Sequence, residues 1–174
     1  MKSGALGLRN GRLLITVGDG NSVNQKQELQ QIQGILPKLV AELERTNFLI
    51  QRLGADRITK TSSQTYMGIC QVSKSSTSRR IDLKVYPRSQ YGYTLLYFIG
   101  SAQINKNMRT QVVQYGYSMS DAAIYKVAGS KASNLDPKIE KSLKALLNAK
   151  TSPSEREIIE AFGMKYVAPA ERDI

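Results

Sequence analysis

The stretch Arg79-Arg80-Ile81-Asp82-Leu83-Lys84-Val85 alternates between charged and apolar residues from Arg80 onward. Successive side chains of a β-strand point to opposite faces, so this period of two predicts a strand whose three apolar residues pack on a helix layer. The other face presents one carboxylate, Asp82, between the cations Arg80 and Lys84. Taken alone, such a face is more often a polar surface with an ion pair than a metal site, because two-metal chemistry needs several converging carboxylates.

The charge of the whole chain points to a polyanionic partner. Its 174 residues include 25 Lys+Arg, 14 Asp+Glu and no His, which gives a formal net charge of +11. The densest basic stretch, residues 74–109, contains seven Lys and Arg residues and one acid, Asp82. A basic excess of this size favours nucleic acid as a partner over an acidic membrane surface.

Composition also excludes several classes of protein. Without His there is no His-based nucleophile relay, and a single cysteine, Cys70, allows neither an internal disulfide nor a thiolate zinc site. No apolar run approaches the roughly 20 residues of a membrane helix, and Met1-Lys2-Ser3-Gly4 opens no signal-peptide hydrophobic region. We therefore expect a soluble, intracellular protein of a reducing compartment, with no membrane partner.

Apolar periodicity predicts the remaining elements. Strands are expected at 12–17, 48–53 and 65–72, helices at 25–46, 91–99, 102–115, 138–149 and 154–162, and short extended pieces at 117–119 and 124–127. Pro37 suggests that the first helix consists of two pieces, and Ser154 with Glu157 has capping-box spacing. The order predicts an α+β fold, with a mixed β-sheet packed on helices over 1–88 and a mostly helical lobe with a small β element over 89–174.

The break between the helices at 91–99 and 102–115 is a candidate ligand site. A glycine at such a break, Gly100, lets backbone approach a ligand closely, and the neighbouring Tyr97 and Phe98 offer flat surfaces for a sugar or base. Asn105 and Arg109 are four residues apart, hence on one helical face. From these residues alone, a solvated helix face beside two core aromatics is the simpler interpretation.

Five motifs occur together in one order. They are Thr65-Tyr-Met-Gly-Ile-Cys-Gln71, Arg79-Arg-Ile-Asp-Leu83, Leu95-Leu-Tyr-Phe-Ile-Gly-Ser101, Asn105-Lys-Asn-Met-Arg109 and Tyr166-Val-Ala-Pro-Ala-Glu-Arg-Asp173. In order and spacing they resemble the catalytic half of family X DNA polymerases, of the beta and lambda type. The resemblance covers roughly residues 12–128 and 151–173, and leaves 129–151 unexplained. It implies a nucleotidyltransferase-type palm followed by a thumb-like lobe.

The resemblance implies gap-filling synthesis in DNA repair, in the nucleus. A primer 3′-hydroxyl would attack the α-phosphate of a deoxynucleoside triphosphate on gapped or primer-template DNA, with Mg²⁺ or Mn²⁺ as cofactor and DNA repair proteins as possible partners. Asp82 would be a metal-binding palm carboxylate and Arg80 the catalytic neighbour that orients the carboxylates.

The other implied roles belong to substrate binding. Tyr97, Phe98 and Gly100 would form the turn against the nucleotide sugar, and Asn105 would contact the base. Arg109 would contact the template side of the nascent pair. The implied DNA-binding residues are Lys84, Lys106 and Arg109.

The sequence departs from the family pattern where the palm begins. The family's Gly-Asp-x-Asp runs into an apolar strand, and in that register Asn10 and Arg12 occupy the two aspartate positions. A guanidinium there adds positive charge where two dications would sit. Asp19 follows the strand instead of preceding it, so a turn explains it better than a metal ligand. Two hypotheses remain: a polymerase whose first residues are divergent, truncated or altered by splicing, and a catalytically inactive module that binds DNA and nucleotide.

Overall fold

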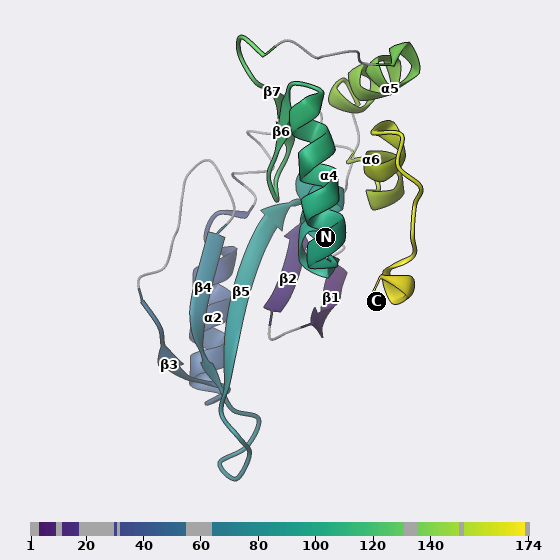
Figure 1. Ribbon diagram of the computed structural model, residues 1–174. Helices are drawn as coiled ribbons and strands as arrows, with labels where there is room; N and C mark the ends of the chain where they lie inside the picture. Colours follow the sequence, from purple (N-terminus) through teal and green to yellow (C-terminus); the bar gives the residue numbers. More distant parts are fainter. Residues whose placement is uncertain are drawn as a thin grey trace. The chain divides into compact units, whose positions relative to one another are not determined.

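The computed structural model describes residues 4–9, 12–17, 30, 32–54, 64–130, 136–149 and 152–172, the first two ranges by their backbone. The chain divides into two compact units, Met1–Arg88 and Ser89–Ile174. Both contain helices and strands, which confirms the α+β prediction (Figure 1). No helix of the described ranges is long and apolar enough to cross a membrane.

The first unit contains a five-stranded mixed sheet in the order β1-β2-β5-β4-β3. The strands are β1 (Gly4–Arg9), β2 (Arg12–Val17), β3 (Leu49–Arg52), β4 (Gln64–Cys70) and β5 (Arg79–Pro87). β2 and β5 run parallel, and the other neighbouring pairs are antiparallel. β5 is third in the order of the five strands, with β2 and β4 on its two edges, and is therefore the central strand of the sheet.

The helix α2 (Ile35–Arg45) packs against β3, β4 and β5 (Figure 1). The three apolar residues of β5 are buried, and they join a core with Leu36 and Val40 of α2 and Tyr66 of β4. This confirms the predicted apolar face of residues 79–85. Burying a large apolar side chain contributes about 1.5–3 kcal/mol, so this shared core holds helix and sheet together.

The prediction that the helix at 25–46 consists of two pieces is confirmed. Gly34, with a φ of 81°, precedes α2, and Pro37 lies in the first turn of α2. Residues 25–29 and 31 lie outside the described ranges. The sequence pattern did not predict β1, because its glycines dilute the apolar alternation. The Asn10-Gly11 dipeptide between β1 and β2 is the residue pair most typical of a tight hairpin, and it could have indicated this strand.

The second unit is mostly helical, as predicted. Its elements are α3 (Tyr91–Ile99), α4 (Ala102–Gln114), β6 (Tyr117–Met119), β7 (Ile124–Lys126), α5 (Pro137–Leu147) and α6 (Glu155–Ala161), with 3₁₀ turns η1 (Arg88–Gln90) before α3 and η2 (Pro169–Glu171) near the end. β6 and β7 form an antiparallel pair beside α4. The core draws Met108 and Val112 from α4, Leu143 from α5 and Ile158 from α6.

Two local features fix the position of α6 within this unit. A Cβ at Gly92 of α3 would overlap the carbonyl oxygen of Pro153, so only glycine allows this close approach. The predicted capping box is present: the Ser154 hydroxyl accepts from the Glu157 amide at 3.2 Å, and the Glu157 carboxylate accepts from the Ser154 amide at 2.7 Å. Both features lie immediately before the first turn of the helix.

Replacing Ser154 with Ala should lower the free energy of unfolding by about 1 kcal/mol, because one amide of the first turn loses its acceptor. Urea denaturation measures this difference. Ser142→Ala is the matched control: Ser142 is exposed within α5, where Ala is the better helix former, so no loss is expected. An equal loss in both variants would contradict the capping role.

The capping contribution should also depend on pH. Hydrogen bonds from the Ser154 hydroxyl and amide hold the pKa of Glu157 below its ordinary value of 4.5. The stabilisation is therefore fully present above that ordinary value and is lost as the pH falls through the lowered pKa of the folded state. The stability difference between the wild type and Glu157→Gln should shrink as the pH falls below the ordinary value of 4.5 and through the lowered pKa of the folded state. A difference that stays constant over this range would contradict the assignment.

Candidate nucleotide and nucleic-acid site

Asp82 lies on the polar face of β5, as the alternation predicts. Its side chain is only 17% exposed, and Asp82 Oδ1 accepts a hydrogen bond from Arg80 Nε at 3.1 Å. Arg80 is 62% exposed, and its Nη2 lies 3.4 Å from Met67 Sδ on β4. The single carboxylate of this face is thus already compensated by a guanidinium, in a pair whose contribution to stability is about 0–1 kcal/mol.

Sheet register decides which other residues share the neighbourhood of Asp82. In the parallel pairing of β2 and β5, Arg12 is the register partner of Asp82. Arg9 of β1 is in turn the partner of Arg12, and Met67 of β4 is the partner of Asp82 on the other edge. Register partners on adjacent strands belong to the same face of a sheet. Across four strands, this register row therefore joins the backbone positions of Arg9, Arg12, Asp82 and Met67.

The row does not fit a two-metal site. Two divalent cations require several converging carboxylates, and within the described residues no three His, Cys, Asp or Glu side chains gather to hold a metal ion. The register pairs the backbone position of Arg12 with that of Asp82, and the resemblance expects an anionic residue at position 12. Asn10 and Asp19 lie outside the described residues.

The face of β5 that holds Asp82 continues to Lys84. Lys84 Nζ donates to the Tyr86 hydroxyl at 3.4 Å and lies 5.9 Å from the centroid of the Tyr86 ring. This ammonium is half-buried against its own strand. Its contact with DNA stays a prediction.

In the second unit, the structure brings together the five residues expected around a nucleotide, four through their side chains and Gly100 through its backbone. Asn105 Nδ2 donates to the backbone carbonyl of Tyr97 at 2.9 Å. The Arg109 guanidinium lies 5.2 Å from the centroid of the Tyr97 ring, within cation–π range. The Tyr97 and Phe98 rings meet edge to face, with centroids 4.9 Å apart. The last turn of α3 and the first two turns of α4 thus form one cluster.

Gly100 occupies the junction of this cluster. Its φ of 71° and ψ of −149° belong to a region that is essentially restricted to glycine. A Cβ would lie 3.3 Å from the Ala102 amide nitrogen. The predicted break at Gly100-Ser101 is therefore confirmed, with backbone open on the side that a side chain would occupy.

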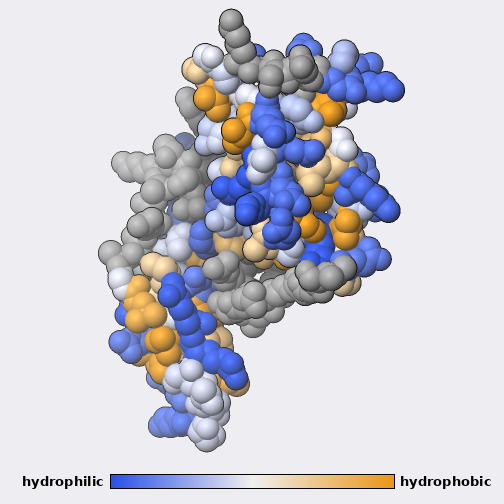
Figure 2. Space-filling model, in the orientation of Figure 1, coloured by the Kyte–Doolittle hydropathy of each residue, from blue (hydrophilic) through white to orange (hydrophobic). Residues whose placement is uncertain are grey.

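Much of the surface over α4 is hydrophilic in the view of Figure 2. Lys106 and Arg109 of α4 are both exposed. The Lys106 carbonyl accepts a hydrogen bond from the Thr110 hydroxyl at 3.0 Å. Two cations one turn apart on an exposed helix suit contact with phosphates. Their contact with DNA also stays a prediction.

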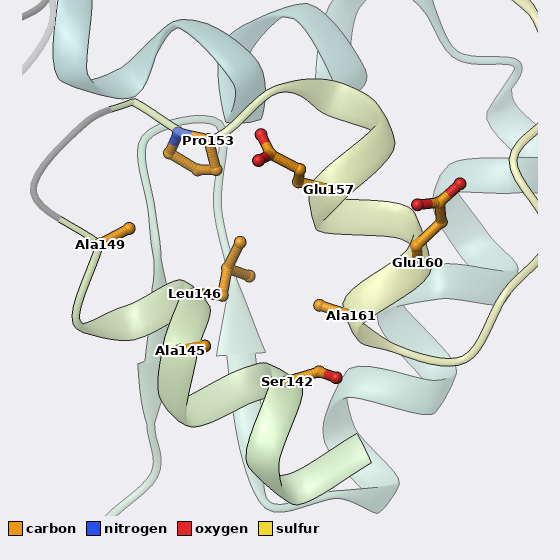
Figure 3. A pocket seen from close by; sticks show the side chains of 8 residues that line it. All are labelled: Ser142, Ala145, Leu146, Ala149, Pro153, Glu157, Glu160 and Ala161. Atoms are coloured by element: carbon orange, nitrogen blue, oxygen red, sulfur yellow. The ribbon is translucent and has the colours of Figure 1, made fainter. Parts of the chain in front are cut away.

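A separate pocket of about 360 Å³ lies between α5 and α6 (Figure 3). Its lining includes Leu146, Ala149, Pro153 and Ala161, with Glu157 and Glu160 at one side. None of the predicted site residues lines it. Glu157 belongs to the capping box and Glu160 Oε1 is bonded to Arg156 at 3.4 Å, so both carboxylates already have partners.

Sequence reasoning missed two residues beside the candidate site. Arg172 Nη1 donates to the Gly100 carbonyl at 3.1 Å and to Glu155 Oε1 at 2.5 Å. Arg172 lies in one of the matching motifs, but no periodicity or spacing connects it with residue 100. Only the tertiary structure joins positions that are 72 residues apart.

Comparison with known proteins agrees with this architecture. Residues 12–88 match the family described as DNA polymerase beta palm, and residues 94–173 match the family described as DNA polymerase beta thumb. Two relatives named DNA polymerase lambda, from Arabidopsis thaliana and Rattus norvegicus, are each 28% identical to the chain over 163 and 160 residues. Each alignment covers 91% of this chain, but only 30% and 26% of the respective relative. The palm match, the thumb match and the polymerase lambda relatives together show that the chain belongs to the family X DNA polymerases, whose palm and thumb regions it comprises.

Proposed function

We propose that this chain is a palm-and-thumb module that binds the end of a DNA duplex and a deoxynucleoside triphosphate, and that it does not by itself hold the two divalent metals of nucleotidyl transfer. The observation behind the proposal is the register of Arg12 with Asp82. Two named relatives are DNA polymerases, and the chain spans less than a third of their length. The binding role and its setting in nuclear DNA repair are therefore proposed from family likeness.

Electrostatics supports the loss of the metal pair. Two unit charges 4 Å apart interact by about 4 kcal/mol at the effective dielectric constant of a protein surface, and the repulsion between an arginine and a dication is about twice that. The single carboxylate of Asp82 already accepts a hydrogen bond from Arg80, so it cannot offset this repulsion for two divalent cations. Mg²⁺ or Mn²⁺ use by this chain would need anionic ligands in place of Asn10 and Arg12.

The nucleotide side of the module supports the binding half of the proposal. Gly100 leaves room for close approach, and Tyr97, Asn105 and Arg109 form one cluster around it. Asn105 Oδ1 is a buried acceptor without a hydrogen-bond partner among the described residues. A buried amide oxygen without a partner costs free energy, which a ligand that donates to it would recover.

A second candidate function is metal-dependent gap filling by the chain itself. The retained Asp82 and Arg80 pair on β5 favours it, since the resemblance expects these residues in an active palm. Both functions predict nucleotide binding, so only measurement of incorporation separates them.

Primer extension on a duplex with a one-nucleotide gap tests the metal site. We expect no incorporation by the wild-type chain with Mg²⁺ or Mn²⁺, and a gain of metal-dependent incorporation in the double variant Asn10→Asp, Arg12→Asp. Adding Asp82→Ala to that double variant should abolish the gain, because the last carboxylate is removed. Metal-dependent incorporation by the wild type that disappears in Asp82→Ala would establish the second candidate instead.

Nucleotide binding has its own test in the thermal shift of the chain. A ligand at 100 times its Kd stabilises the folded state by about 2.7 kcal/mol, so a deoxynucleoside triphosphate should raise the melting temperature. Asn105→Ala should weaken binding by roughly five- to tenfold, because one hydrogen bond is lost. Asn107→Ala is the matched control, since Asn107 is exposed on the same helix and accepts from Gln103 at 2.8 Å. Equal loss in both variants, or no shift for the wild type, would contradict the nucleotide site.

A further inference from the structure

The side chain of Arg172 is completely buried in the second unit, and that of Glu155 is only 5% exposed. Arg172 Nη1 donates to both Glu155 Oε1 and the Gly100 carbonyl, while Nε donates to the Val167 carbonyl at 2.8 Å. One guanidinium therefore joins the α3–α4 junction, the first turn of α6 and the segment that precedes η2. These three places are far apart in the sequence.

Stability alone is a weak reason for a buried ion pair. Removing two charges from water costs several kcal/mol per ion, and well-packed apolar residues of similar volume are often at least as stabilising. A planar guanidinium does, however, fix several acceptors in one geometry, which a flexible ammonium does not. The arrangement of Arg172 is thus better suited to holding backbone in place than to adding free energy.

The backbone that Arg172 holds is that of Gly100. On its amide side, Gly100 N donates to the Leu96 carbonyl at 3.3 Å, at the end of α3. On its carbonyl side, the hydrogen bond from Arg172 holds the peptide group that leads into α4. Glycine is the residue with the widest choice of backbone angles, so its conformation here depends on these outside contacts. These two hydrogen bonds of Gly100 set the orientation of the turn, and the proposed nucleotide sugar would lie against this turn.

We propose that Arg172, held by Glu155, is a positioning residue for the Gly100 turn and thereby sets how strongly the module prefers a deoxyribose over a ribose. The inference rests on the proposed nucleotide binding. A turn held rigidly against the sugar excludes a 2′-hydroxyl by contact with backbone, whereas a turn that can shift accommodates the extra oxygen.

The structure supplies a matched control on the same aromatic ring. The guanidinium carbons of Arg172 and Arg156 lie 5.5 Å and 4.1 Å from the centroid of the Tyr166 ring. Arg156 is exposed and bonds Glu160, and no interaction between Arg156 and Gly100 is found among the described residues. Replacing Arg156 perturbs the ring contact without changing the Gly100 carbonyl.

The first experiment compares the affinities of dATP and ATP for the wild type, Arg172→Lys and Arg156→Lys. We expect the preference for dATP to fall roughly tenfold in Arg172→Lys, as for the loss of a hydrogen bond from a charged donor, and to stay unchanged in Arg156→Lys. Glu155→Gln keeps an acceptor oxygen for the Arg172 guanidinium but loses the charge, so it should be less stable than the wild type and show a smaller fall in the same direction. Circular dichroism confirms the fold of each variant at the assay temperature. Folded Arg172 and Glu155 variants with the wild-type preference would overturn the proposal.

The second experiment needs no nucleotide. The Gly100 amide donates to the Leu96 carbonyl and the Asn105 amide donates to the Ser101 carbonyl, one on each side of the turn. Hydrogen exchange at these two amides therefore reports how often the backbone of the turn opens. We expect exchange at these two amides to be roughly tenfold faster in Arg172→Lys or Glu155→Gln, and unchanged in Arg156→Lys. Unchanged exchange in all three variants would overturn the positioning role, whether or not nucleotide binds. Faster exchange together with absent nucleotide binding would instead reject the proposed function, and with it the preference for deoxyribose.

Discussion

The first unit depends on the pairing of β5 along both of its edges. β2 pairs in parallel with residues 82–87 of β5, and β4 pairs antiparallel with residues 79–85, so backbone pairing sets the register on both edges. The same pairing packs the apolar face of β5 on α2 and places the position of Arg12 beside Asp82. A register slip of one residue would move every side chain to the opposite face, so the core and this neighbourhood are fixed together.

This constraint is compatible with the proposal that the palm fold persists without its own metal pair. The fold requires apolar residues on one face of β5 and paired strands on its edges, and the described residues meet both requirements. Chemistry requires anionic ligands on the other face, where the register row contains two arginine positions and one carboxylate. Folding and catalysis thus depend on opposite faces of the same strand, and a change on one face need not disturb the other.

The second unit is organised by a buried polar network in addition to its apolar core. Arg172 contacts the Gly100 junction, α6 and the segment near η2, while Gly92 and the capping box fix the start of α6. Such a network tolerates little change, because an unpaired charge in a dry interior is costly. The buried side chains of Arg172 and Glu155 therefore connect the Gly100 turn to α6 and to the segment near η2, although neither residue is among those predicted to contact the nucleotide.

Local chemistry explains why much of this could be predicted from the sequence. The alternation of residues 80–85, the glycine break at 100 and the capping pair Ser154 and Glu157 are encoded by residues close in sequence, and the structure confirms all three. Helical spacing also predicted that Asn105 and Arg109 share one face of α4, whereas the contacts of both residues with Tyr97 across the break depend on the tertiary structure. The register of Arg12 with Asp82 and the bond from Arg172 to Gly100 could not be derived in this way, because they join segments 70 and 72 residues apart. The sequence by itself determined the helices and strands and the residues available to a site, because propensity and periodicity are local. Only the tertiary structure decided which residues share a face of the sheet and which side chain holds the Gly100 turn, because these depend on strand order and on burial.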